Sequence, residues 1–177
     1  DTYRNCATAS MTLSDGTTVE AEDCHSEGTA DLEIVKSAMF EVCTPGEVCQ
    51  FEYTVNNVGN GDYNGSITLN DSITPIGGQF TAITPALCDP ADLTGAGCTG
   101  TASIPANGSV TYLVDYMASN EQGAAANDAL IDGENCVALT DETMGQFDYP
   151  NELGGHTSCA EFQIGKPKLS ISKILEG

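Results

Sequence analysis

The sequence predicts an all-β protein, an immunoglobulin-like antiparallel β-sandwich stapled by disulfides. Three observations lead to this fold class. Short segments in which apolar and polar residues alternate recur about every ten residues, between clusters of Gly, Pro, Asn and Asp. The eight cysteines, an even number without a Cys-x-x-Cys pair, favour disulfides over a zinc site. No helical periodicity is sustained, and 40% apolar content in 177 residues suffices for one proper core.

Alternation locates the individual strands along the chain. In the first of them, Leu32 and Ile34 share one face while Glu33 and Val35 share the other. By the same criterion we expect strands at residues 32–37, 49–55, 66–69, 80–83, 101–104 and 110–114. Residues 124–131 are alanine-rich and could favour helix, but they lie between two glycines where the sandwich lacks its last member, so we interpret them as a strand.

The two ends of the chain resemble each other. The landmarks Asn5-Cys6, Cys24 and Leu32 recur in the same order as Asn135-Cys136, Cys159 and Leu169. The offsets are 130 (6 to 136), 135 (24 to 159) and 137 (32 to 169) residues, which indicates a repeat with small insertions. We therefore expect residues 1–30 to be the tail of a preceding repeat or a junction segment, 31–166 to be a complete sandwich repeat, and 167–177 to be the first strand of the next repeat or a donor strand.

The repeat also indicates how the cysteines pair. Because Cys6 and Cys24 occupy the same relative positions as Cys136 and Cys159, pairing within each copy treats both copies alike. Nearness in sequence then predicts the two remaining disulfides, Cys43 with Cys49 and Cys88 with Cys98. Four disulfides imply an oxidising compartment, and we expect an extracellular or cell-surface location.

The surface is strongly acidic. Asp and Glu number 26 against five Lys and Arg, which gives a formal charge of -21. Such a surface repels phosphate backbones and anionic lipid, so we expect neither nucleic-acid binding nor direct membrane insertion. We expect no cofactor; calcium is a minor alternative, because acidic residues gather in the two junction segments, although no EF-hand loop occurs and a solvated acidic surface accounts for them equally well. These residues are Asp15, Glu20, Glu22, Asp23, Glu27 and Asp31, and Asp141, Glu142, Asp148, Glu152 and Glu161.

Several motifs stand in a recognisable order. They are the Leu-x-Ile-x-Lys segment at 32–36, residues 53–63 followed by 67–72, the Cys88 and Cys98 pair ahead of 105–109, and Asn135-Cys136. Their order resembles the bacterial surface repeat family called domain of unknown function eleven. This resemblance implies tandem immunoglobulin-like units in large secreted or cell-envelope proteins, without catalytic residues. The sequence departs from the family pattern at Asn57, where Thr is usual, and at Cys43 and Cys49, which are not a general family feature.

Two sets of residues suggest chemistry. Lys36, an acidic residue such as Glu52, and Asn127 in the presumed last strand form a candidate set for an intramolecular isopeptide bond; the ordinary alternative is that Lys36 is a solvated charge at a strand edge. His25 and His156 lie near serines, but no G-x-S-x-G elbow or positioned third group accompanies them. We therefore expect no enzyme.

The function expected is that of a non-catalytic structural subunit or repeat in an extracellular bacterial filament or surface fibre. Its partners would be neighbouring copies of the same protein, joined head-to-tail by strand exchange or by covalent tandem linkage. The apolar residues of the inter-unit strand would be Leu169, Ile171 and Ile174. The alternative is an adhesin-type module that binds a glycan or protein through the loops at 57–64 or 88–98, where Tyr63 is the obvious aromatic platform.

Overall fold

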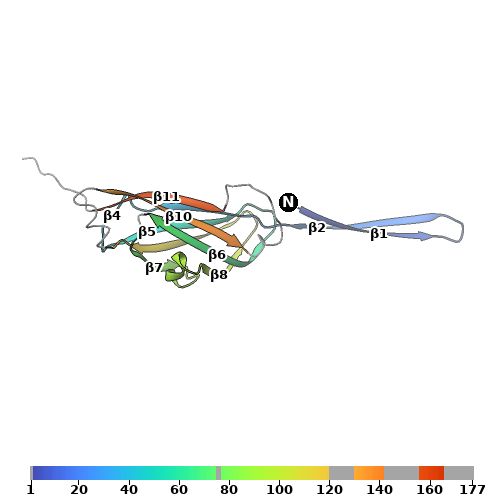
Figure 1. The fold of residues 1–177 in the computed structure, drawn as a ribbon. Coiled ribbons are helices and arrows are strands. Elements are labelled where there is room, and N and C mark those ends of the chain that lie inside the picture. The colour runs from blue at the N-terminus through green and yellow to red at the C-terminus, as the bar shows by residue number, and fades with distance from the viewer. Residues whose placement is uncertain (1, 75–76, 120–129, 142–155, 166–177) are drawn as a thin grey trace, which may run out of the picture.

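The computed structural model describes residues 2–74, 77–119, 130–141 and 156–165, which form a sandwich and a projecting two-stranded ribbon (Figure 1). The ribbon consists of β1 (Thr2–Thr12) and β2 (Thr18–Gly28). The other elements are β3 (Leu32–Ala38), β4 (Val42–Cys43), β5 (Val48–Asn57), β6 (Tyr63–Thr74), β7 (Gln79–Thr84), the short 3₁₀ helix η1 (Pro90–Thr94), β8 (Cys98–Ile104), β9 (Ser109–Met117), β10 (Ile131–Asp141) and β11 (Thr157–Ile164).

Two sheets pack face to face to make the sandwich. One has the strand order β4-β11-β10-β6-β8 and the other β3-β5-β9-β7. Every pairing within them is antiparallel except that of β11 with the two-residue β4, which is parallel. The disulfide-stapled, antiparallel β-sandwich that the sequence predicts is thus confirmed.

The core lies between the two sheets because every second side chain of each strand points inward. In β5, alternate residues from Cys49 to Asn57 are buried, and β10 follows the same rule from Gly133 to Leu139. Aromatic rings pack together in this core. Phe40, Phe51 and Phe162 meet edge to face, with ring centroids 5.1 to 5.6 Å apart, a geometry that aromatic pairs favour.

Most predicted strands lie inside observed ones. The predictions at 32–37, 49–55, 80–83, 101–104 and 110–114 fall within β3, β5, β7, β8 and β9, and 66–69 is the middle of the longer β6. The strand predicted at 124–131 lies largely outside the described residues, while β10 and β11, which we did not predict, belong to the described sandwich. The sequence of β10 does not show the alternation of apolar and polar residues, because Gly133 and Asn135 occupy buried positions that are usually apolar.

The ribbon β1–β2 extends away from one end of the sandwich (Figure 1). Its register is continuous from Thr2 opposite Gly28 to Thr12 opposite Thr18. At the tip, Leu13 N–H donates to the Thr17 carbonyl at 2.7 Å, and Gly16 takes a φ of 85°, which suits a residue without Cβ. Within the described residues no sandwich strand pairs with either ribbon strand. No helix among these residues has the length and apolar character needed to cross a membrane.

Candidate functional site

The ribbon leaves the sandwich at a fixed point. After β2 ends, Thr29 N–H donates to the Asn60 side-chain oxygen at 3.1 Å, and Gly61 N–H donates back to the Thr29 carbonyl at 3.2 Å. Gly28 packs so closely on this loop that a Cβ there would collide with the Asn60 carbonyl. The base of the ribbon is therefore held by its backbone contacts with side-chain and backbone atoms of the loop between β5 and β6.

Asn57 organises that loop from inside. It is buried at the end of β5, where its side-chain oxygen accepts two backbone N–H groups and its side-chain nitrogen contacts three backbone carbonyls. The partners are Asp31 and Gly59 at 3.1 Å each, and Gly61, Ile104 and Pro105 at 2.8, 3.1 and 3.3 Å. A single amide thus joins the start of β3, the β5–β6 loop and the end of β8, an arrangement that only an amide's combined donor and acceptor groups can satisfy.

One face of the ribbon is apolar and exposed. The opposed pairs Ala9–Ala21 and Met11–Val19 lie on it, and Ala7 on the same face is opposite the acidic residue Asp23. Met11 and Val19 are 61% and 50% exposed, although side chains of this kind are normally buried in the interior. The other face carries polar residues and the disulfide between Cys6 and Cys24. Within the described residues nothing covers this apolar face, although an isolated two-stranded ribbon is only marginally stable in water.

The ribbon reproduces the last hairpin of the sandwich. In both, the disulfide joins directly opposed residues, Cys6 with Cys24 and Cys136 with Cys159, with Cα atoms 4.0 Å apart. Val137 and Leu139, one and three residues beyond Cys136, are buried in the sandwich core. The residues one and three beyond Cys6 are Ala7 and Ala9, on the apolar face. The apolar face of β1–β2, which is exposed, thus corresponds to the face of β10–β11 that is buried.

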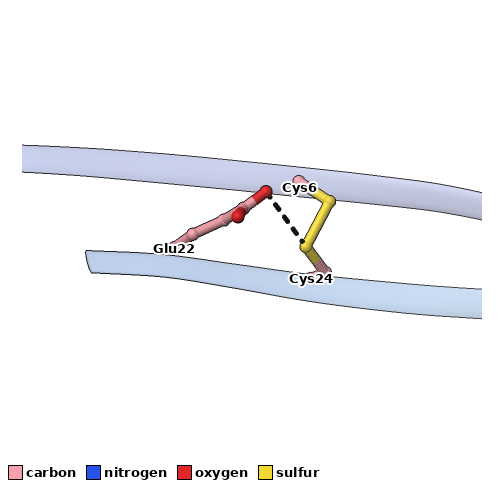
Figure 2. Close-up of side chains that lie close together, drawn as sticks. All are labelled: Cys6, Glu22 and Cys24. Carbon is pink, nitrogen blue, oxygen red and sulfur yellow. Dashed lines mark hydrogen bonds between the residues drawn. A yellow bond between two sulfur atoms is a disulfide. The ribbon is translucent and has the colours of Figure 1, made fainter. Parts of the chain in front are cut away.

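The four disulfides of the structure join the same pairs that the sequence predicts: Cys6–Cys24, Cys43–Cys49, Cys88–Cys98 and Cys136–Cys159. Figure 2 shows the first of them bridging the ribbon strands, with a Glu22 oxygen 3.4 Å from Cys24 Sγ. A disulfide sulfur carries no hydrogen, so this is a contact without proton donation. Glu22 with Cys6 and Cys24, and Glu134 with Cys136 and Cys159, have metal-like spacing, but their thiolates are consumed by the disulfides.

A group of interacting polar side chains lies inside the sandwich. Lys36 follows Leu32 and Ile34 on the inner face of β3, and its side chain has no exposed surface. Its Nζ donates to Asp71 Oδ2 at 2.7 Å and to the Tyr53 hydroxyl at 3.0 Å. The Tyr53 hydroxyl in turn donates to the same oxygen of Asp71. The alternative of a solvated edge charge is therefore wrong for Lys36.

Burial drives all three of these groups toward their neutral forms. It lowers the pKa of Lys36 to about 8, against the opposing attraction of Asp71. Burial likewise raises the pKa of the Asp71 carboxyl, although Lys36 and Tyr53 both oppose this. The pKa of Tyr53 rises well above its ordinary value, through burial first and then through the nearby Asp71 charge. The Lys36 and Asp71 charges are thus poorly stabilised where they lie.

Asn135 belongs to the same interior. It is fully buried on β10, where it opposes Ile73 of β6, two residues from the pair formed by Val137 and Asp71. Its amide lies close enough to the Tyr53 hydroxyl to act against the rise in that group's pKa. Even so, within the described residues neither its Oδ1 nor its Nδ2 makes a hydrogen bond of ordinary geometry, and the same holds for Asp71 Oδ1. Buried polar atoms are rarely left in this state.

The remaining predicted residues fall into two groups. Glu52 lies on the outer face of β5 with no role at Lys36, so the prediction of its part in the candidate bond is wrong, and the carboxylate is Asp71. Tyr63 is buried, and its hydroxyl donates to the Ser66 carbonyl at 2.7 Å, which removes it as an exposed platform for a sugar. Outside the described residues lie Asn127, the acidic residues Glu142, Asp148 and Glu152, and the strand residues Leu169, Ile171 and Ile174.

Sequence comparison identifies no relative. No family model and no curated protein matches the chain, so the resemblance to domain of unknown function eleven stays a prediction.

Among solved structures, the chain is similar to a CARDB domain from Pyrococcus furiosus in complex with di-metal ions, with 11% identity, TM-score 0.45, and 77% of this chain and 94% of that chain covered. It is also similar to AvmM, which catalyses macrocyclization in alchivemycin A biosynthesis, at 16% identity, TM-score 0.46, and 81% and 92% coverage. For the bacterial hydrophobin BslA the values are 7%, 0.38, and 77% and 96%. Similarities at this level transfer no function.

Proposed function

We propose that the protein is a non-catalytic structural subunit or repeat of an extracellular bacterial filament or surface fibre, in which each unit contacts the next head-to-tail. The observation that carries this proposal is the ribbon β1–β2, whose disulfide, register and apolar face match those of β10–β11. In a neighbouring unit the ribbon takes the place that β10–β11 has in the described sandwich. Its apolar face then covers a core, as the corresponding face of β10–β11 does.

Two forms of linkage produce this contact. In one long polypeptide the ribbon is the last hairpin of the preceding sandwich, and residues 167–177 supply the first strand of the following one. Between separate subunits, the ribbon exchanges with the equivalent hairpin of a neighbour, and exchange of an identical element costs little. The contact surfaces are the same in both forms. Four disulfides are typical of proteins that leave the cytoplasm and support an extracellular location.

The test compares the two faces of the ribbon. Met11→Lys with Val19→Asp places an opposite-charge pair on the apolar face, and Thr12→Lys with Thr18→Asp places the same pair on the polar face one position away. Sedimentation velocity and electron microscopy of the purified proteins measure assembly. We expect the wild type and the polar-face variant to assemble and the apolar-face variant to remain monomeric.

The tandem form is tested by measuring the mass of the native polypeptide in extracellular material from the source. A polypeptide long enough to contain further copies supports linkage in one chain. A monomer of 18.4 kDa in that material, together with purified wild type that stays monomeric at every concentration, contradicts both forms.

A further inference from the structure

The buried cluster formed by Lys36, Asp71, Tyr53 and Asn135 has the composition of a reaction site. It contains a primary amine, a carboxyl group that touches it at 2.7 Å, and a carboxamide. Tyr53 connects the first two groups, because its hydroxyl lies 3.0 Å from Lys36 Nζ and donates to Asp71. Asn135 is a diagonal neighbour of Asp71 on the inner face of the adjacent strand. The amine comes from the four-stranded sheet and the other two groups come from neighbouring strands of the facing sheet.

As a purely structural arrangement this cluster is incomplete. Three of its buried polar atoms, Asp71 Oδ1 and both amide atoms of Asn135, make no hydrogen bond within the described part of the chain. Each unsatisfied buried group of this kind costs about 1–3 kcal/mol. A polar side chain at the fully buried position of Asn135 is therefore unfavourable for stability, unless it takes part in something other than packing.

We propose that Lys36 Nζ and Asn135 Cγ join in an intramolecular amide bond, and that Asp71 transfers the protons. The neutral amine attacks the carboxamide carbon, forming the new C–N bond. The protonated Asp71 carboxyl delivers its proton to the Asn135 nitrogen, whose bond to Cγ breaks, and then takes up a proton from Nζ. One molecule of ammonia leaves, Asp71 returns to its starting state, and no oxidant, reductant or co-reactant is consumed. The chain reacts with itself once, so the step does not make the protein an enzyme.

The environment suits this reaction. A lysine amine attacks only when it is neutral, and a carboxyl group polarises a carbonyl only when it is protonated. Burial favours both of these forms, and the 2.7 Å contact allows the proton to pass directly from Lys36 to Asp71. The rings of Phe51 and Tyr53, 4.9 and 4.3 Å from Nζ, shield the site from water, which would otherwise compete for the carboxamide.

The internal repeat supplies an independent observation. Asn5 precedes Cys6 as Asn135 precedes Cys136, and Lys173 follows Leu169 by four residues as Lys36 follows Leu32. Strand formation requires neither an Asn nor a Lys at these positions, since both residue types are uncommon at buried strand positions. Each partial copy thus repeats one of the two residues that form the proposed bond, the Asn at the N-terminal end and the Lys at the C-terminal end. The proposed bond replaces Asn127 with Asn135 as the acceptor, and it does not depend on how units assemble.

Intact-mass measurement of the reduced wild-type protein tests the bond directly. We expect a mass about 17 Da below that of the sequence, the mass of ammonia. Proteolysis and fragmentation should then yield a branched peptide that joins Lys36 to Asn135. Lys36→Met and Asn135→Ala should each have the full sequence mass. Asp71→Ala should also have the full mass, and if that variant does not fold, the branched peptide of the wild type decides the existence of the bond.

Three results would overturn the proposal. The first is a wild-type protein of full mass, which would leave an ion pair and nothing more. The second is a loss of about 18 Da with Lys36 joined to Asp71, which is condensation with release of water. The third is a loss of about 17 Da that persists in Lys36→Met, because it would then arise from a side chain other than Lys36. A bond that forms fully in Asp71→Ala overturns the proton-transfer role of Asp71.

Discussion

Lys36 and Asp71 form an ion pair at 2.7 Å between two side chains that have no exposed surface. They come from facing sheets, so the contact crosses the core rather than running along a strand. Removing two charges from water is costly, and such a pair contributes little net stability compared with an apolar pair. Its presence in the core of a structural domain therefore calls for an account other than stability.

The cost of breaking this pair can be measured without interference from the proposed amide. In an Asn135→Ala background, where Lys36 is free, adding Asp71→Ala should lower the free energy of unfolding by about 3–5 kcal/mol, because it leaves a buried charge unpaired. The double change Lys36→Met with Asp71→Leu, in the same background, should be substantially less destabilising. Urea denaturation measures both. Equal losses in the two variants would mean that the ion pair is not what the single change disrupts.

The Asn135→Ala variant should also gain stability as the pH rises from 8 to 10. Burial lowers the pKa of folded Lys36 to about 8 from its ordinary 10.5, so in this window the unfolded chain binds more protons than the folded one. The free energy of unfolding then increases with pH. Above pH 10 the raised pKa of Tyr53 acts in the opposite direction, which sets the upper limit.

Two controls accompany this titration. Wild type in which Lys36 is an amide should lack the rise, because an amide nitrogen does not titrate in this range. Asn135→Ala combined with Lys36→Met should lack it too. A rise of the same size in all three proteins would assign the effect to other groups.

The two equivalent disulfides should differ in their contribution to stability. Replacing Cys136 and Cys159 by Ser should destabilise the sandwich by about 3 kcal/mol, the value for closing a loop of this size. Replacing Cys6 and Cys24, which close a loop of similar length, should leave unfolding of the isolated sandwich nearly unchanged, because no described sandwich strand pairs with the ribbon. Denaturant midpoints of the two double variants make the comparison. Equal losses would show that the ribbon is part of the cooperative unit.

The stability of the protein should depend on the charge of the residue that replaces Asn57. Asn57→Ala should cost about 2–4 kcal/mol, since several buried backbone groups lose their partner. Asn57→Asp keeps the shape but turns a carboxylate oxygen toward the carbonyls of Gly61 and Ile104, so it should cost more at neutral pH and recover in acid. Thermal unfolding across pH measures this, and an aspartate variant as stable as wild type at pH 7 would contradict the assigned hydrogen bonds.

The sequence predicts the sandwich well where a strand has one buried and one exposed face. The regular alternation of Phe51, Tyr53 and Val55 locates β5. The repeated Cys positions predict two of the disulfide pairs found in the structure, and nearness in sequence predicts the other two. Prediction from alternation fails at β10, where Asn135 interrupts the apolar pattern.

The buried cluster could be predicted only in part. Alternation already places Lys36 on the same face as Leu32 and Ile34, which was a signal for burial. Its partner could not be found in this way, because Asp71 is 35 residues away and meets Lys36 only when the two sheets face each other. Glu52 is nearer in sequence but lies on the outer face of its strand. The correspondence of Asn5 with Asn135 was the one sequence signal that pointed to the acceptor.

Hydrogen exchange in the ribbon tests the proposed head-to-tail contact most directly. β10, the equivalent of β1, pairs with β11 on one side and β6 on the other. The account therefore predicts that β1 amides pointing away from β2 exchange quickly in dilute purified protein and become protected in native extracellular material. Equal exchange of these amides in the two samples would contradict the account.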